Sequence, residues 1–367
     1  MAQRLETLEI AGSPLFIGQD ALQKLAVQID TVLKGKQNII ILTDRNSNSL
    51  CLPVLLEQVP QLLKAYPIII EPGEVYKTIQ TCEFIWTQLA GAGANRQSLL
   101  INLGGGVITD MGGFAAATFH RGMPFINIPT TLMSMIDAGI GGKTGVNIAS
   151  LKNMAGLFVN PQAVFVWPGF LKTLPHKYLL SGYAEIMKDA LIADADLWKD
   201  LIKFHITAIN NWDDLLHRSA MIKCKVVNND PQETGSRRLL NFGHTFGHAF
   251  ETFSLRHDTS PISHGEAIAM GMICEAYISY CLIGFDLPEL EEVIRNILLN
   301  FDHYPIESSN IDELFEIIMY DKKNRNGNIL ITMLKSIGKA VDGLQCEAPL
   351  IRECLLNYVD IMRGIIK

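Results

Sequence analysis

The 367-residue sequence lacks several features that would each place it in a particular class of protein. No apolar run approaches the roughly 20 residues of a membrane span, and the first residues contain no apolar segment typical of a signal peptide. The seven cysteines are scattered and include no C-x-x-C pair, which suits a reducing compartment better than a disulfide framework. We therefore expect a cytoplasmic protein that does not enter a membrane.

The sequence also lacks any excess of positive charge. Its 31 lysines and arginines are outnumbered by 38 aspartates and glutamates, which leaves a net charge of −7 and argues against a nucleic-acid-binding surface. Hydrophobic residues make up 48% of the chain and charged residues 19%, as in a globular protein. A chain of this length more often forms two domains than one.

The first half of the sequence alternates between short apolar runs and helix-length segments such as 49–65 and 74–92. The apolar runs are rich in β-branched residues and bounded by turn formers, as buried parallel strands are. These runs are 38–43, 67–71, 98–103, 125–128 and 163–167. Their alternation with helices predicts a parallel sheet covered by helices on both faces.

The pattern changes after Pro168-Gly169. From Pro175 to about Leu299 the apolar spacing is helical, and strand-like sequence returns only at 328–332. We therefore expect an α/β domain over 1–168 and a mostly α-helical domain over 169–367.

A glycine-rich turn, 104–106, follows one predicted strand and opens a predicted helix. Glycines let a ligand approach the backbone closely, and the start of a helix offers amides to a phosphate. The turn departs from the G-x-G-x-x-G fingerprint, yet it lies where nucleotides bind to parallel sheets. We interpret it as a nucleotide site, with a simple tight turn as the alternative. Thr130 and Thr131 follow the next strand and either bind the same nucleotide or cap a helix.

The segment 137–145 superficially resembles a phosphate-binding P-loop. Asp137 stands where that motif needs its first glycine, so the motif is not satisfied. The Gly-Gly-Lys turn that ends at Lys143 still indicates a lysine presented to an anion.

Three histidines gather in one predicted helical region. His244 and His248 are four residues apart and would share a helix face, and His264 follows. Thr245 replaces the glutamate of the H-E-x-x-H motif, which argues against a metalloprotease. With Glu185, the histidines could form a Glu/His/His zinc site that keeps one position open. The alternatives are core histidines bonded to backbone carbonyls, and a surface ion pair of Glu185 with Lys188.

Six cations are more than an apolar scaffold needs structurally. If they converge, they would bind a small polyanion such as a phosphorylated acid. They are Arg121, Lys143, Lys152, Lys188, Lys223 and Arg237.

Together these motifs resemble the 3-dehydroquinate synthase family in order and spacing, over nearly the whole chain. The matching segments are 73–77, 104–110, 121–122, 129–131, 141–144, 152–154, 185–188, 233–235, 237, 240–248, 264–266 and 321–323. The resemblance implies a Rossmann-like NAD-binding α/β domain and a helical, metal-binding domain, with the active site between them. The chain departs from the family at Ala138 and Gly139, where two serines are common, and at 147–150, which lacks the usual proline.

The resemblance implies a lyase of the shikimate pathway of aromatic amino acid biosynthesis. Such an enzyme converts 3-deoxy-D-arabino-heptulosonate 7-phosphate to 3-dehydroquinate and phosphate, through NAD-assisted oxidation, phosphate elimination, reduction and aldol cyclisation. The alternatives are another sugar-phosphate cyclase, a metal-dependent polyol dehydrogenase and a non-catalytic protein of the same fold. The retained Arg237 and Asn241 argue against another cyclase, and the Glu185-x-x-Lys188 unit argues against a dehydrogenase. The intact set of ligands argues against a non-catalytic protein.

The resemblance also assigns roles to residues. Glu185, His244 and His264 would bind Zn²⁺ or Co²⁺, and His248 would transfer a proton. The substrate would be bound by Asp137, Lys143, Asn153, Lys188, Lys223, Arg237, Asn241 and either Lys322 or Lys323. Arg121 would reach the substrate phosphate from the neighbouring subunit of a homodimer. NAD would lie on Gly73, Glu74, Lys77, Gly105, Gly106, Val107, Asp110, Thr130, Thr131, Lys143, Lys152, Leu171, Lys172 and Thr173.

Overall fold

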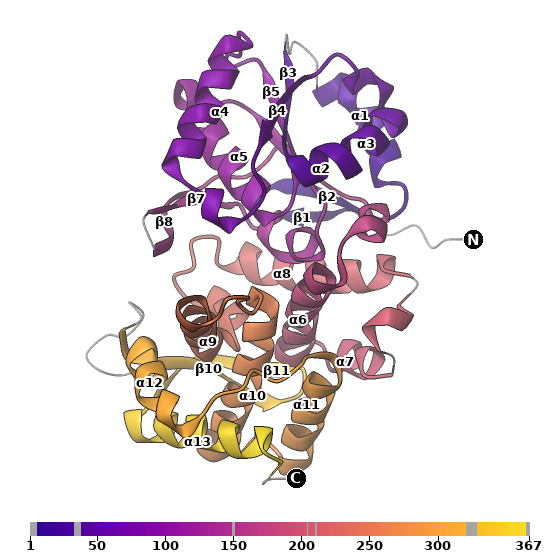
Figure 1. Ribbon diagram of the computed structural model, residues 1–367. Coiled ribbons are helices and arrows are strands. Elements are labelled where there is room, and N and C mark those ends of the chain that lie inside the picture. Colours follow the sequence, from indigo (N-terminus) through magenta and orange to yellow (C-terminus); the bar gives the residue numbers. More distant parts are fainter. Residues whose placement is uncertain are drawn as a thin grey trace. The chain divides into compact units, whose positions relative to one another are not determined.

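The computed structural model describes residues 6–32, 38–148, 151–203, 205–209, 211–320 and 329–364. Contacts within the chain divide it into two compact units, the first comprising 1–175 and 211–228 and the second 176–210 and 229–367 (Figure 1). The helix α8 (Asp213–Asn229) therefore belongs almost entirely to the first unit, although it lies late in the sequence. The boundary at 168/169 stays a prediction.

A seven-stranded sheet in the order β1-β2-β9-β6-β5-β3-β4 forms the core of the first unit. Strands β1 and β2 pair antiparallel, and every other neighbouring pair is parallel. All five strands predicted from the sequence are present, which confirms the parallel α/β class. The strands are β1 (Leu8–Ile10), β2 (Ser13–Ile17), β3 (Ile39–Asp44), β4 (Tyr66–Ile70), β5 (Leu99–Gly104), β6 (Phe125–Pro129) and β9 (Val164–Val166).

Helices cover both faces of this sheet. Figure 1 shows one group of helices on one side of β3 to β5 and a second group on the other. The first group is α4 (Ile79–Gly91) and α5 (Gly106–Thr118), and the second is α1 (Ala21–Val32), α2 (Arg45–Leu50) and α3 (Leu52–Gln58). The predicted helical segments 49–65 and 74–92 are each divided. Pro53 opens α3 and Pro60 opens a separate 3-10 turn, because proline favours the first turn of a helix.

One element of the first unit differs from the sequence interpretation. The stretch around Lys143 and Lys152 forms a hairpin of β7 (Lys143–Ile148) and β8 (Leu151–Phe158). The hairpin packs closely on α5, because a Cβ on Gly113 would lie 2.4 Å from Cγ2 of Thr144. Its glycines, lysines and asparagines carry little strand propensity, so tertiary packing decides this element.

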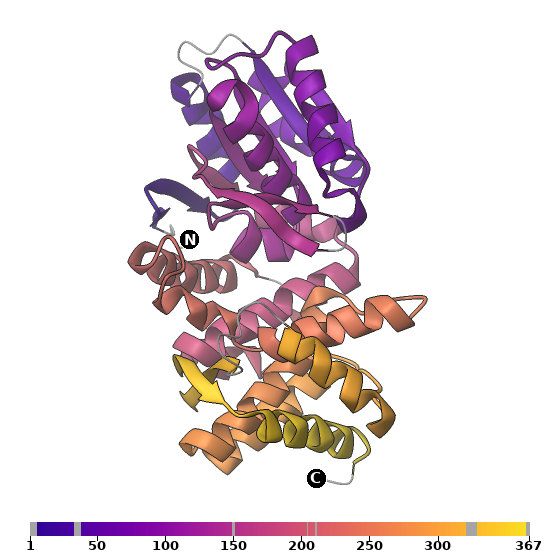
Figure 2. The same cartoon turned by 90° about the vertical axis from the view of Figure 1, so that its left-hand side faces the viewer.

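The second unit is mostly helical, as predicted, with one hairpin of β10 (Ile329–Ser336) and β11 (Lys339–Cys346). Its central helix is α10 (His264–Ile283), which packs against α6, α9, α11, α13 and β10 (Figure 2). The surrounding helices are α6 (His176–Ala193), α7 (Ala195–Leu201), α9 (His244–His257), α11 (Leu287–Asn300), α12 (Ile311–Tyr320) and α13 (Ala348–Met362).

Among the described residues, α10 alone is long and apolar enough to cross a membrane. However, 67% of its most apolar window is buried inside the protein, as in a core helix. Its burial on all sides explains the apolar composition without a membrane.

The backbone of α10 approaches α6 and α9 too closely for side chains at the points of contact. A Cβ on Gly265 would lie 2.2 Å from the carbonyl oxygen of Ser181 on α6, and a Cβ on Gly271 would lie 1.9 Å from that of Gly243 before α9. The N–H of Gly265 also donates to Oγ of Ser181 at 3.0 Å. These contacts fix the relative positions of the three helices that carry the histidines and Glu185.

Candidate metal centre and nucleotide site

Three helices of the second unit bring a carboxylate and three imidazoles together. Oε1 of Glu185 on α6 lies 3.8 Å from Nε2 of His244 on α9, and 3.7 Å from Nε2 of His264 on α10. His248, one turn after His244, joins the cluster, and the ligand atoms of the three histidines lie within 4.8 Å of one another. The cluster is therefore small enough for one ion to reach several of its members.

The other ring nitrogens of two of these histidines already have partners. Nδ1 of His244 lies 3.1 Å from the carbonyl oxygen of Phe242, and Nδ1 of His264 lies 3.2 Å from Oε2 of Glu251. A carbonyl accepts a hydrogen bond only from a protonated Nδ1, so the lone pair of His244 remains on Nε2, and the Glu251 carboxylate selects the same tautomer of His264. Such outer partners orient the imidazoles of metal centres. Both Nε2 atoms face Glu185.

Electrostatics also keep His244 in the form that binds metals. Burial lowers the pKa of His244 well below its usual value, and the nearby charge of Lys188 lowers it further. The imidazole is consequently neutral around pH 7 and retains its lone pair. Lys188 itself is buried, and its Nζ lies 2.5 Å from Oε2 of Glu185 and 3.6 Å from Oδ1 of Asp189. The pairing of Glu185 with Lys188 is thus a buried contact of this cluster and not a surface ion pair.

The cluster fits a divalent metal chemically, because carboxylate oxygen and neutral imidazole nitrogen are ordinary ligands of Zn²⁺ and Co²⁺. Two ligand sets are possible on this geometry. One combines Glu185 with His244 and His264, and the other consists of the three histidines. The first set is favoured because Oε1 of Glu185 faces the Nε2 atoms of both His244 and His264.

A tight loop before α9 positions Arg237. The carboxylate of Asp230 accepts hydrogen bonds from the backbone N–H groups of Thr234, Gly235 and Arg237 at 2.9, 2.7 and 3.0 Å. The guanidinium of Arg237, which is buried, donates to the carbonyl of Pro231 at 2.8 Å. The hydrogen bonds from the backbone lower the pKa of Asp230 from 3.8 to about 2, and the bond from the Arg237 N–H has the largest effect.

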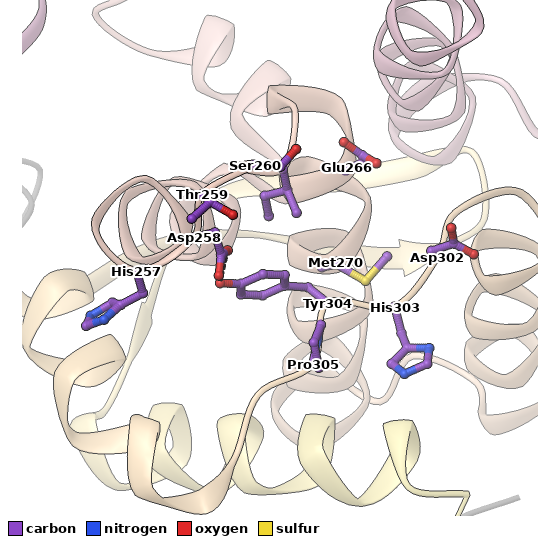
Figure 3. Close-up of a pocket in the computed structure, with 11 residues that line it drawn as sticks. His257, Asp258, Thr259, Ser260, Glu266, Met270, Asp302, His303, Tyr304 and Pro305 are labelled. Carbon is purple, nitrogen blue, oxygen red and sulfur yellow. Dashed lines mark hydrogen bonds between the residues drawn. The ribbon is translucent and has the colours of Figure 1, made fainter.

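The segment that joins α9 to α10 borders a separate cavity of about 480 Å³. In Figure 3 the ring of Tyr304 points toward Asp258, and its hydroxyl donates to Oδ2 of Asp258 at 2.7 Å. Oγ of Ser254 donates to the same oxygen. None of the residues that line the cavity is among the predicted site residues. The bonds to Asp258 hold the connection between the two histidine-bearing helices.

In the first unit, most of the predicted NAD residues follow the carboxyl ends of neighbouring parallel strands. Gly73 follows β4, Gly105 follows β5, Thr130 follows β6 and Leu171 follows β9. This edge is where α/β sheets bind nucleotides. Gly105, at the start of α5, offers no side chain to cap the helix, so the first amides of α5 are left available to an anion. The site fits the phosphates of a dinucleotide.

Predicted residues contact each other here in two groups, one of three residues around Lys77 and one formed by Lys223 and Asp137. Nζ of Lys77 lies 2.5 Å from Oδ2 of Asp110 and 2.5 Å from Oδ1 of Asn153. Burial raises the pKa of Asp110, and the charge of Lys77 opposes this effect. Nζ of Lys223 on α8 pairs with the carboxylate of Asp137 and also donates to its carbonyl at 2.6 Å. Asp137 lies in a short π-helix, 134–138, a form often found at functional sites.

Several other predicted residues are exposed. Lys143 and Lys152 are exposed on the β7–β8 hairpin, and Lys172 is exposed after β9. Arg121 is also exposed and follows α5. Lys322 and Lys323 lie outside the described residues.

Asp44 is a candidate that the sequence interpretation missed. It ends β3, between the Gly105 turn and the Gly73 turn, and its side chain accepts from the N–H of Ser47 at 2.7 Å. An acidic residue at such a strand end suits the hydroxyls of a ribose. The aspartate directly after the apolar run 38–43 is the signal that could have found it.

The family models that match the chain are consistent with this geometry. Residues 67–181 match the model described as 3-dehydroquinate synthase N-terminal, and residues 182–324 match that described as 3-dehydroquinate synthase C-terminal. A 3-dehydroquinate synthase of Parabacteroides distasonis is 42% identical over 330 residues, which cover 89% of this chain and 91% of that protein.

Solved structures of related cyclases share the fold. The 2-epi-5-epi-valiolone synthase from Streptomyces hygroscopicus, with NAD⁺ and Zn²⁺ bound, is 26% identical with a TM-score of 0.81, and covers 98% of this chain and 100% of its own. A 2-deoxy-scyllo-inosose synthase complexed with carbaglucose-6-phosphate, NAD⁺ and Co²⁺ is 24% identical with a TM-score of 0.79, and covers 95% of this chain and 98% of its own.

The Asp230 loop leads to a prediction about acid stability. Because the folded pKa of Asp230 lies below its ordinary 3.8, its stabilising effect is complete above that pH and is lost as the pH falls toward about 2. Asp230→Asn should lower the melting temperature at neutral pH. It should also reduce the loss of stability that occurs as the pH falls from 3.8 to about 2. Thermal unfolding followed by circular dichroism would measure both effects. Asp286→Asn, at an exposed site without a capping bond, is the control and should change neither.

Proposed function

The chain belongs to the 3-dehydroquinate synthase family, and from this premise we propose how its own residues carry out the reaction. It is a lyase that converts 3-deoxy-D-arabino-heptulosonate 7-phosphate to 3-dehydroquinate and phosphate, in the shikimate pathway, with NAD and Zn²⁺ or Co²⁺ as cofactors. The observation that carries the assignment of the site is Glu185, whose carboxylate faces two imidazoles already oriented by other partners.

In the second unit, we propose that Glu185, His244 and His264 hold the metal and that His248 transfers a proton. When bound, the metal supplies positive charge that polarises substrate hydroxyls. His248 lies close enough to His244 and His264 to reach a substrate bound at the metal. It need not be a ligand itself, because three protein ligands and one open position complete such a site. Lys188 offsets the charge of Glu185 in a buried setting, and Lys188, Arg237 and Asn241 bind substrate oxygens.

In the first unit, we propose that Asp137, Lys143, Asn153 and Lys223 bind the substrate, joined by Lys322 from outside the described residues. The cations would hold the carboxylate and phosphate and stabilise negative charge as it develops. NAD, which supplies the transient oxidation, would lie along the carboxyl edge of the sheet. The residues proposed to contact NAD are Gly73 to Lys77, Gly105 to Asp110, Thr130 and Thr131, Lys143, Lys152 and Leu171 to Thr173.

We further propose a homodimer in which Arg121 binds the phosphate at the partner's site. Arg121 follows the carboxyl end of α5, whereas the Gly105 turn precedes its start, so the 13-residue helix separates them by about 20 Å. His120, Arg121 and Gly122 all have positive φ, of 51°, 65° and 116°. Left-handed backbone at two non-glycine residues is strained, and such strain often accompanies function. Arg121 is exposed and lies at the opposite end of α5 from the Gly105 turn.

We also propose that the protein works in the cytoplasm. All seven cysteines carry free thiols in the structure, which suits a reducing compartment.

The function is tested by phosphate release from the heptulosonate phosphate. Catalytic amounts of NAD should suffice, NADH should not accumulate, and a chelator should stop the reaction, because the oxidation is reversed within each turnover. NADH formed in proportion to substrate consumed would instead indicate a polyol dehydrogenase.

The two possible ligand sets predict opposite results for two variants. Glu185→Gln should weaken binding of Co²⁺ by more than the roughly 10- to 100-fold typical of an outer partner. His248→Ala should keep the metal and slow turnover by about 100- to 10,000-fold, the usual contribution of a proton-transfer group. Metal content and turnover would be measured on the same samples. His257→Ala is the control, since this histidine of α9 pairs with the surface residue Glu313. Loss of metal from His248→Ala but not from Glu185→Gln would identify the three histidines as the ligands.

The role of Arg121 is tested by subunit complementation. Arg121→Ala and His248→Ala should each be nearly inactive alone. If Arg121 acts across the interface, each hybrid dimer contains one complete site of two, so random mixing should restore about a quarter of wild-type activity. Lys24→Ala provides the mixing control, because it alters a partly exposed residue of α1 whose ion pair is with Asp20, just before the same helix. Verified hybrids without recovered activity would show that Arg121 serves its own chain or neither.

A further inference from the structure

We propose that Glu275 is a positioning residue that fixes His244 for metal binding. This inference rests on the proposed metal site and adds a residue that does not touch the metal itself. Glu275 lies on α10 and is fully buried. Its two carboxylate oxygens accept hydrogen bonds from two backbone N–H groups of a different helix: Oε2 from Gly243 at 2.8 Å and Oε1 from Thr245 at 2.9 Å.

The two donors stand directly before and after His244. Glu275 therefore holds the backbone on both sides of the proposed ligand. The first N–H groups of any helix lack partners within the helix, and Gly243 provides no side chain to cap α9. The carboxylate from α10 takes the place of a local cap. Its negative charge also suits the positive end of the helix dipole.

Glu275 also links the backbone around His244 to the helix that carries His264. His264 and Glu275 are eleven residues apart on α10, which is about three turns, so they lie on the same face of the helix. One face of α10 thus carries a ligand and, three turns later, the group that holds the other ligand. The Gly243–Gly271 contact lies between them and leaves no room for a side chain. The spacing between the Nε2 atoms of His244 and His264 consequently depends on Glu275.

A carboxylate has a property here that an amide lacks. The two N–H donors reach different oxygens of Glu275, and only a carboxylate places an acceptor at both positions. In Glu275→Gln one oxygen would become an NH₂ group, which would face a backbone N–H and repel it. The start of α9 should move, and metal sites tolerate only small displacements of their ligands.

The test compares Co²⁺ binding by metal-free wild type and Glu275→Gln, using chelator competition and the visible absorption of bound Co²⁺. We expect about 10- to 100-fold weaker binding, as for other outer partners of metal ligands, and an altered absorption band. The band reports ligand geometry, which a merely structural role would not change. Gly271→Ala should shift the same band, because its new Cβ would displace the carbonyl of Gly243.

Ser279→Ala is the matched control. Ser279 is fully buried on the same helix. Its Oγ donates to the backbone carbonyl of Glu275 at 2.6 Å and accepts from the N–H of Leu334 at 2.9 Å, so these bonds join the backbone of α10 to β10 and do not involve the Glu275 carboxylate. The variant should lose stability without any change in Co²⁺ affinity or absorption. Unfolding of all variants by urea would separate stability from binding.

Each outcome has one interpretation. Wild type that binds no Co²⁺ would contradict the proposed metal site. Wild-type binding together with unchanged affinity and absorption in Glu275→Gln would overturn the role of Glu275. Equal weakening in Glu275→Gln and Ser279→Ala would also overturn it, since the effect would then follow general stability. If Glu275→Gln does not fold, Glu275→Asp keeps both acceptors on a shorter stem, and its Co²⁺ affinity and absorption decide in the same way.

Discussion

The proposed metal centre depends on how closely three helix backbones approach one another. Helix α10 contacts α6 at Gly265 and the start of α9 at Gly271, where an added Cβ would collide with a backbone carbonyl. Protein interiors are close-packed, so such contacts leave few alternative arrangements. Because Glu185, His244 and His264 each lie on a different one of these helices, the backbone contacts determine the distances between them.

Burial then determines the chemical state of the groups. Polar and charged groups in an apolar interior are costly unless they have partners, and here each proposed ligand has one. Lys188 pairs with Glu185, and the carbonyl of Phe242 and the carboxylate of Glu251 take the Nδ1 protons of the two histidines. The same environment lowers the pKa of His244. Packing and electrostatics therefore favour one arrangement, in which two imidazole lone pairs face one carboxylate.

The proposed nucleotide site of the first unit follows a simpler constraint. Parallel strands end at one edge of a sheet, so residues far apart in sequence meet there. The sequence indicated most of this edge, because the strands are continuous apolar runs and the turns after them contain glycines and threonines. It missed Asp44, whose single carboxylate carries no pattern, and the β7–β8 hairpin, whose residues have weak strand propensity.

The sequence by itself determined the fold class of both units and the family, since apolar periodicity and motif spacing are local properties of the chain. It named Glu185, His244 and His264 only through the resemblance, because their own spacing left core histidines and a surface ion pair open. Only the tertiary structure showed that Glu185 and Lys188 form a buried pair, that Glu251 and Phe242 select the histidine tautomers, and that Glu275 holds the backbone around His244. These relations join residues on different helices, and their geometry arises from packing, which no local pattern in the sequence specifies.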